Sequence, residues 1–105
     1  MHKLLTDAPG KEMLLLGNEA IARGALEAGL SFSACYPGTP SSEIPQQFFD
    51  ISKETDLYFE YSTNEKVAME VGGTAAVCGL RTMVTVKLVG LNVAADPLMT
   101  LAYVG

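Results

Sequence analysis

The sequence is poor in the residues from which several common functional sites are built. Its 105 residues include a single histidine, His2, which we expect in a loose terminus, so a Ser–His–Asp triad and a histidine-ligated metal are excluded. The two cysteines, Cys35 and Cys78, lie far apart in the chain among apolar residues and cannot form an iron–sulfur ligand set. We expect both thiols to be buried and reduced, as in a cytoplasmic protein, and we expect no metal site in this chain.

Patterns for nucleotides, nucleic acids and membranes are missing as well. Neither G-x-G-x-x-G nor G-x-x-x-x-G-K-[ST] occurs, so dinucleotide and P-loop phosphate binding are not supported. Seven basic residues are scattered among twelve acidic ones, with a net charge of −5, which argues against a nucleic-acid partner. No apolar run reaches the roughly 18 residues of a membrane span, and the amino terminus lacks a signal-peptide pattern. We therefore expect a cytoplasmic protein.

Charge is scarce, above all in the carboxyl-terminal third. Charged residues make up 18% of the chain, against about 25% in typical domains, and apolar residues 49%, which excludes intrinsic disorder. Between residues 71 and 105 the only charges are Arg81, Lys87 and Asp96. A chain of this length forms one domain, and one small core cannot bury so much apolar surface. We expect a partner, or further chain, to cover part of it.

Strand-like and helix-like patterns alternate four times along the chain. Short apolar runs predict strands over residues 13–16, 31–36, 57–61 and 82–86. Helices are predicted over residues 19–30, from 41 or 42 to about 53, over 65–78, and from 92 to the end. This alternation predicts an α/β layered fold with a mostly parallel sheet and helices on both faces. The last helix has no strand after it, so the domain is expected to be truncated.

Several residues are expected to mark the beginnings and the packing of these elements. Asn18 is expected to cap the first helix, residues 62–64 (Ser-Thr-Asn) offer caps for the helix that begins at Glu65, and Asn92 is a candidate cap for the last. Gly24 costs the first helix about 1 kcal/mol relative to alanine, and we expect it to allow close packing. Residues 1–12 look like a polar lead-in that ends at Pro9-Gly10.

Ligands of open parallel sheets bind at the carboxyl ends of the strands, in the loops that lead into helices. Here these loops are residues 17–18, 37–42, 62–65 and 87–92. Glu65 begins a helix rich in glycine and alanine, so that helix should pack unusually close to a neighbour. The simplest interpretation of Glu65 is a favourable charge at a helix amino terminus. Close packing would also desolvate it and suit it to proton transfer.

Four segments in order resemble the amino-terminal region of 2-oxoacid:ferredoxin oxidoreductases, in particular the alpha subunits of the indolepyruvate branch. They are LGNEA followed by GAL at residues 16–26, YPGTPSSE at 36–43, NEKVA at 64–68 and GLNVAADPLM at 90–99. The resemblance covers residues 13–105. It implies that these residues form a partial pyrimidine-binding domain of a thiamine diphosphate enzyme.

The resemblance also implies roles for particular residues. Glu65 matches the catalytic glutamate that hydrogen-bonds the pyrimidine N1′ and so assists removal of the thiazolium C2 proton. The matching cofactor loops contain Pro37, Gly38 and Thr39 on one side and Gly90, Leu91 and Asn92 on the other.

Two residues are candidates for contact with the substrate: Thr39 through the resemblance, and Lys87 as a lone cation at the carboxyl end of a predicted strand. Thr39 is a candidate donor to the substrate carboxylate, although turn chemistry alone also explains residues 37–39. Lys87 either steers an anionic substrate or is simply solvated. Leu88 stands where the resemblance leads us to expect a histidine, so this chain lacks any substrate contact or proton transfer that such a histidine would supply.

A parent enzyme of this family would oxidatively decarboxylate a 2-oxoacid to acyl-CoA and reduce ferredoxin. The implied partners are the rest of the alpha subunit or a diphosphate-binding domain, a beta subunit, ferredoxin, the 2-oxoacid and CoA, in an oligomer. Mg²⁺ and 4Fe–4S clusters would be bound by regions absent from this chain. The chain alone should therefore be inactive.

Two alternative functions remain open. The chain could be a non-catalytic α/β module that binds a protein through its apolar carboxyl-terminal third, or a flavodoxin-like nucleotide binder.

Overall fold

Three short strands form a parallel sheet with the order β2-β1-β3. The computed structural model describes residues 1–105 and contains β1 (Phe32–Cys35), β2 (Tyr58–Tyr61) and β3 (Thr82–Thr85). In the register, Ala34 of the central strand lies opposite Glu60 on one side and Val84 on the other. Parallel neighbours need crossover connections, and helices supply them here. The predicted parallel sheet is confirmed.

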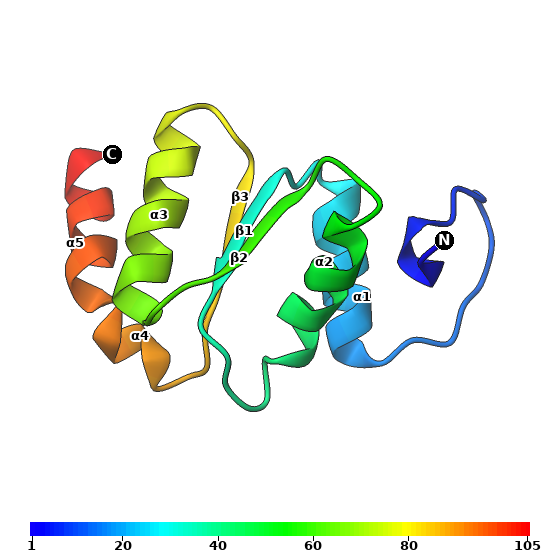
Figure 1. Ribbon diagram of the computed structural model, residues 1–105, viewed down its shortest axis with the longest axis horizontal. Coiled ribbons are helices and arrows are strands. Elements are labelled where there is room, and N and C mark those ends of the chain that lie inside the picture. The colour runs from blue at the N-terminus through cyan, green and yellow to red at the C-terminus, as the bar shows by residue number, and fades with distance from the viewer.

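Helices cover both faces of this sheet, as predicted (Figure 1). Helices α1 (Gly17–Glu27) and α2 (Glu43–Ser52) lie on one face, and α3 (Glu65–Val77) and α5 (Ala95–Val104) lie on the other side. The four-residue α4 (Gly90–Val93) precedes α5, and a 3-10 helix, η1 (Lys3–Leu5), lies outside α1. The predicted α/β layered architecture is therefore present.

The two faces are packed differently. Apolar side chains, most of them large, form a core around α1 and α2, made of Leu4, Ala22, Ile44, Phe48, Ile51 and Leu57. On the other face the small residues of α3 allow a close approach: a Cβ added at Gly72 would lie 2.4 Å from Cγ2 of Val84 on β3. A Cβ at Gly73 would lie 2.9 Å from the Leu101 side chain of α5. The close packing expected of this helix is confirmed.

The predicted strand over residues 13–16 is wrong. This segment forms no strand and approaches the start of α1 from the side of that helix away from the sheet (Figure 1). Leu14 is fully exposed, whereas Leu15 packs against the core. A short apolar run does not by itself distinguish a strand from an extended connection, because strand formation needs a neighbour to pair with.

The predicted helix starts are right at α3 and wrong at two other helices. The Asn64 side chain caps α3 by accepting a hydrogen bond from the Val67 backbone N–H at 2.9 Å, as expected. Asn18 is not a cap, because α1 begins earlier and its capping position is Leu16, whose N–H bonds the Glu19 carboxylate at 2.9 Å. Asn92 lies inside α4, and a separate helix, α5, starts only at Ala95.

Two expectations about small side chains are also wrong. Cys35 is buried, but Cys78 is exposed, because it follows the last residue of α3 where the chain turns at the surface. A Cβ added at Gly24 would meet no atom within 4 Å, so no close neighbour requires this glycine.

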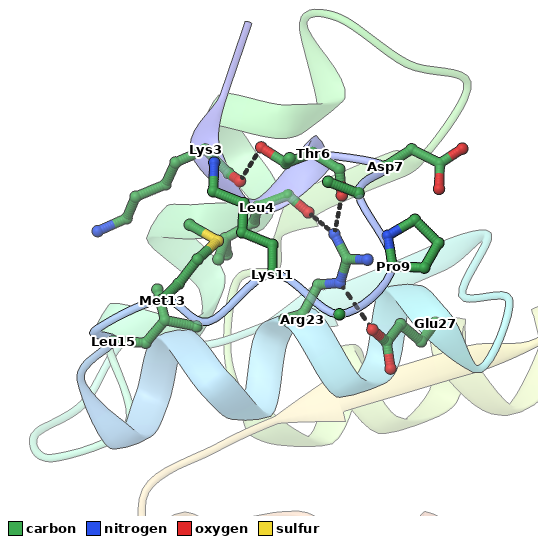
Figure 2. A pocket seen from close by; sticks show the side chains of 12 residues that line it. Lys3, Leu4, Thr6, Asp7, Pro9, Lys11, Met13, Leu15, Arg23 and Glu27 are labelled. Atoms are coloured by element: carbon green, nitrogen blue, oxygen red, sulfur yellow. Dashed lines mark hydrogen bonds and ion pairs between the residues drawn. The ribbon is translucent and has the colours of Figure 1, made fainter.

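The amino terminus is attached to the domain rather than loose. The His2 Nδ1 atom accepts a hydrogen bond from the Leu4 N–H at 3.1 Å, and Leu4 itself is 1% exposed within the core. Arg23 of α1 donates to the carbonyls of Leu4 and Thr6 at 2.7 and 2.8 Å beside a cavity of about 470 Å³ (Figure 2). The terminus is ordered because Leu4 completes the core. None of the helices has the length and apolar character needed to cross a membrane.

Candidate functional site

The loops that follow the three strands meet at one edge of the sheet. The starts of α1, α2 and α3 lie at this same edge (Figure 1). From the central strand β1 the chain passes to α2 on one face, and from its neighbour β3 it passes to α4 beside α3. Loops that diverge in this way from adjacent parallel strands form the crevice in which such sheets bind ligands. The predicted site residues all belong to these loops or to the helices that follow them.

Glu65 and Gly90, which come from two separate predicted segments, lie against each other at this edge. Glu65 is the first residue of α3 and is only 5% exposed. A Cβ added at Gly90 would lie 2.8 Å from Cγ of Glu65 and 3.2 Å from Cβ of Val86, so the Glu65 side chain fits in this position because residue 90 is glycine.

The Glu65 carboxylate has no cationic partner, since none of the ion pairs in the chain includes it. A buried carboxylate is costly unless it meets hydrogen-bond donors. The positive end of the α3 dipole offsets part of that cost. The remaining capacity of its oxygens to accept hydrogen bonds is available to a ligand.

Lys87 and Gly38 make a second close approach across the same edge. A Cβ added at Gly38 would lie 2.7 Å from Cδ of Lys87, so the aliphatic stem of the lysine lies over the backbone of the loop after β1. The ammonium group takes part in none of the ion pairs of the chain. An unpaired cation therefore borders the loop that contains Thr39, whose side chain is exposed.

The loop over residues 37–42 is held by polar contacts. The N–H and the hydroxyl of Ser41 both donate to the Gly38 carbonyl, at 2.9 and 3.0 Å. The Asn18 amide nitrogen donates to the Pro40 carbonyl at 2.8 Å and to the Glu43 carboxylate at 3.0 Å. Sequence reasoning assigned Asn18 only a capping role. Its proximity to the loop depends on how α1 and α2 pack, which no local pattern encodes.

A cavity of about 440 Å³ opens beside this loop. It is lined by Pro37, Ser42, Glu43, Gln46 and Tyr61. Burial raises the pKa of Tyr61 above its usual value of 10, and the nearby Cys35 and Asp50 raise it further. The phenol therefore stays protonated at neutral pH and can donate a hydrogen bond.

Other predicted residues are not drawn into this group. Leu91 and Asn92 lie in α4 with exposed side chains, and Leu88 is 86% exposed. The chain contains no cluster of three or more histidine, cysteine or acidic side chains that could hold a metal ion. The candidate site therefore consists of Glu65 with Gly90, and of the loop over residues 37–42 with Lys87.

Comparison with known proteins finds close relatives. The chain is 54% identical to the indolepyruvate oxidoreductase subunit IorA of Archaeoglobus fulgidus over 109 aligned residues, which cover all of this chain and 18% of that subunit. It is 54% identical to the subunit of the same name from Pyrococcus horikoshii, over 97% of this chain and 16% of that subunit. It is 51% identical to the 2-oxoglutarate synthase subunit KorA of Methanothermobacter marburgensis, over 66% of this chain and 17% of that subunit.

The chain thus spans less than a fifth of the length of these relatives. No protein-family model and no solved structure matches it.

Proposed function

Because this chain belongs to the family of indolepyruvate oxidoreductase IorA subunits and matches their amino-terminal region, we propose that residues 13–105 form part of the thiamine diphosphate pyrimidine-binding domain of an indolepyruvate:ferredoxin oxidoreductase alpha subunit. In this proposal the whole enzyme oxidatively decarboxylates an arylpyruvate to acyl-CoA and transfers electrons to ferredoxin. The observation that carries the proposal is the buried carboxylate of Glu65, which lies against Gly90 without a cationic partner.

The residues present suit the pyrimidine end of this cofactor. Thiamine diphosphate, when bound, supplies the carbon nucleophile and the electron sink that decarboxylation of a 2-oxoacid requires. We assign to Glu65 the hydrogen bond to the pyrimidine N1′, a ring nitrogen that has no hydrogen of its own, so the Glu65 carboxyl group would donate the proton that it shares with the ring. Gly90, Leu91 and Asn92 form the segment beside the ring. The absence of a side chain at Gly90 supports this assignment, because it lets the Glu65 side chain take its buried position against this segment.

The substrate side of the proposed site is the loop after β1 together with Lys87. The Thr39 hydroxyl donates a hydrogen bond to the carboxylate of the 2-oxoacid. Pro37 and Gly38 line the site beside the cofactor and the substrate. Lys87 attracts the anionic substrate, and its lack of an acidic partner supports that role, because its charge is not neutralised within the chain. The exposed Leu88 contributes no proton-transfer group, so proton movement here depends on Glu65.

Other parts of the enzyme complete the site in this proposal. Ligands for Mg²⁺ and for 4Fe–4S clusters come from other regions, because this chain has neither an acidic cluster nor a cysteine cluster. The proposed partners are the rest of the alpha subunit or another diphosphate-binding domain, the beta subunit, ferredoxin, and CoA. The isolated chain is then inactive, and the working enzyme is an oligomer.

The test is the substitution Glu65→Gln in the assembled oxidoreductase. We expect indolepyruvate-dependent reduction of ferredoxin to fall by about 100-fold or more, because general acid–base groups contribute factors of about 10² to 10⁴. The matched control is Glu70→Gln, which removes an exposed carboxylate from the same helix and should leave the rate unchanged. Near-normal activity of Glu65→Gln would overturn the proposed role.

A further inference from the structure

Asn18 connects α1 to both the loop after β1 and the first turn of α2. Its amide nitrogen lies 2.8 Å from the Pro40 carbonyl oxygen and 3.0 Å from Oε1 of Glu43, so both hydrogens of the amide have an acceptor. These acceptors are 22 and 25 residues away along the chain. The contacts therefore fix the position of the loop relative to the body of the domain.

Little else holds the outer part of this loop. Pro37, Thr39 and Pro40 are exposed, so the loop has little packing to define its conformation. On the side of β3 it meets the flexible stem of Lys87 at Gly38, and internally Ser41 bonds back to Gly38. From α1, the Asn18 side chain donates a hydrogen bond to the carbonyl of Pro40, and Pro40 is the residue directly after Thr39.

We infer that Asn18 is a positioning residue that acts through Thr39, holding the threonine hydroxyl where it can bind the carboxylate of the 2-oxoacid. This inference rests on the proposed function, since Thr39 has its substrate role only there. Asn18 does not touch the substrate. It reduces the number of conformations that the loop must give up when the substrate binds.

The chemistry of the two acceptors explains why an amide is required. A carbonyl oxygen and a carboxylate both need donors, and the NH₂ group of asparagine supplies two. An aspartate at this position has nearly the same shape but donates no hydrogen when ionised, and it would place a second negative charge beside Glu43. Asn18→Asp should therefore disturb the loop more than Asn18→Ala does.

The experiment measures kcat and KM for the arylpyruvate in the assembled complex with Asn18→Ala and Asn18→Asp. We expect KM to rise about tenfold for Asn18→Ala and further for Asn18→Asp, with a much smaller change in kcat, because the lost interaction serves binding in the ground state and the transition state alike. The control, Ala20→Asp, adds the same charge to an exposed position in the first turns of α1 and removes no hydrogen bond, so its KM should stay normal. Asn18→Asp keeps the size of the side chain, so the test stands even if the alanine variant fails to assemble.

A double substitution separates the inference from the function on which it rests. If Asn18 acts through Thr39, adding Asn18→Ala to Thr39→Val should raise KM by less than twofold beyond Thr39→Val alone. Additive effects, or a normal KM for both Asn18 variants while Thr39→Val raises KM, would overturn the role of Asn18. A normal KM for Thr39→Val would overturn the role of Thr39 itself, and that of Asn18 with it.

Hydrogen exchange gives a readout that does not depend on turnover. In the complex without substrate, the peptide covering residues 36–43 should exchange at least several-fold faster in Asn18→Ala than in the unmodified protein, because the Ser41 N–H bond to Gly38 opens more often. Unchanged exchange in this peptide would contradict the inference.

Discussion

At the scale of single residues, the candidate site depends on a glycine as much as on a carboxylate. Glu65 can be buried at the start of α3 because the backbone at Gly90 comes close without a side chain. The chemical type of both residues was predictable, since a glutamate at a helix start and a glycine in a loop are visible in the sequence. Their contact was not, because 25 residues separate them and no periodic pattern connects the two positions.

The substitution Gly90→Ala tests this contact. The new Cβ would lie 2.8 Å from Cγ of Glu65, and its other near neighbour is the branched Cβ of Val86 at 3.2 Å, so the glutamate must move. We expect the Kd for thiamine diphosphate, measured by calorimetry on the complex, to rise at least about tenfold, the equivalent of about 1.4 kcal/mol. Gly24→Ala is the control, because its Cβ meets nothing, and it should leave the Kd unchanged. Equal Kd values for both variants would contradict the prediction.

At the scale of elements, the small residues of α3 decide how close that helix lies to the sheet. The sequence predicted a close approach from the composition of the helix but did not say which neighbour it approaches. In the structure, Gly72 faces Val84 of β3 and Gly73 faces Leu101 of α5. Two consecutive glycines thus serve two different contacts, because successive helical positions point about 100° apart.

Gly72→Ala should destabilise the chain even though alanine is the better helix former. A Cβ 2.4 Å from Cγ2 of Val84 forces α3 or β3 to shift, and overpacking of this kind costs about 1–3 kcal/mol. The free energy of unfolding in urea measures the loss. The same substitution should cost less in a Val84→Ala background, which lacks the clashing methyl group. An unchanged or increased stability of Gly72→Ala would refute the close contact.

At the scale of the whole molecule, the first residues are part of the domain. Leu4 is buried in the core, and Arg23 donates to the carbonyls of Leu4 and Thr6 (Figure 2). The Lys3 ammonium lies 2.7 Å from the Glu19 carboxylate. The hydrogen bond from Lys3 lowers the pKa of Glu19 below its usual value of 4.5, and the Leu16 N–H lowers it further.

This ion pair predicts a pH dependence of stability. Because the folded-state pKa of Glu19 is lowered, its contribution is present above about pH 4.5 and is lost as the pH falls through the lowered pKa. Lys3→Met should therefore reduce the free energy of unfolding at pH 7 and weaken its fall as the pH drops below about 4.5. Lys11→Met is the control, because Lys11 lines the same cavity without an ion pair. Identical pH profiles for the two variants would contradict this assignment.

Much of the architecture could be predicted because it follows from local periodicity. The strands after residue 30, the helices between them and the parallel arrangement were all visible as alternating patterns, and Asn64 was recognisable as a cap. The errors lie where a short segment has no strong pattern of its own. Residues 13–16 have the apolar character of a strand, but they have no neighbouring strand with which to pair.

The sequence by itself therefore determined the types and order of most elements after residue 30, the edge of the sheet at which the loops after the strands meet, and the motifs that identify the family. These are properties of neighbouring residues and of their spacing. Only the tertiary structure decided that Gly90 borders Glu65, that Lys87 lies over Gly38, that Asn18 holds the loop around Thr39, and that Leu4 completes the core. Each of these contacts joins residues far apart in the chain, and their proximity arises only when the helices pack on the sheet.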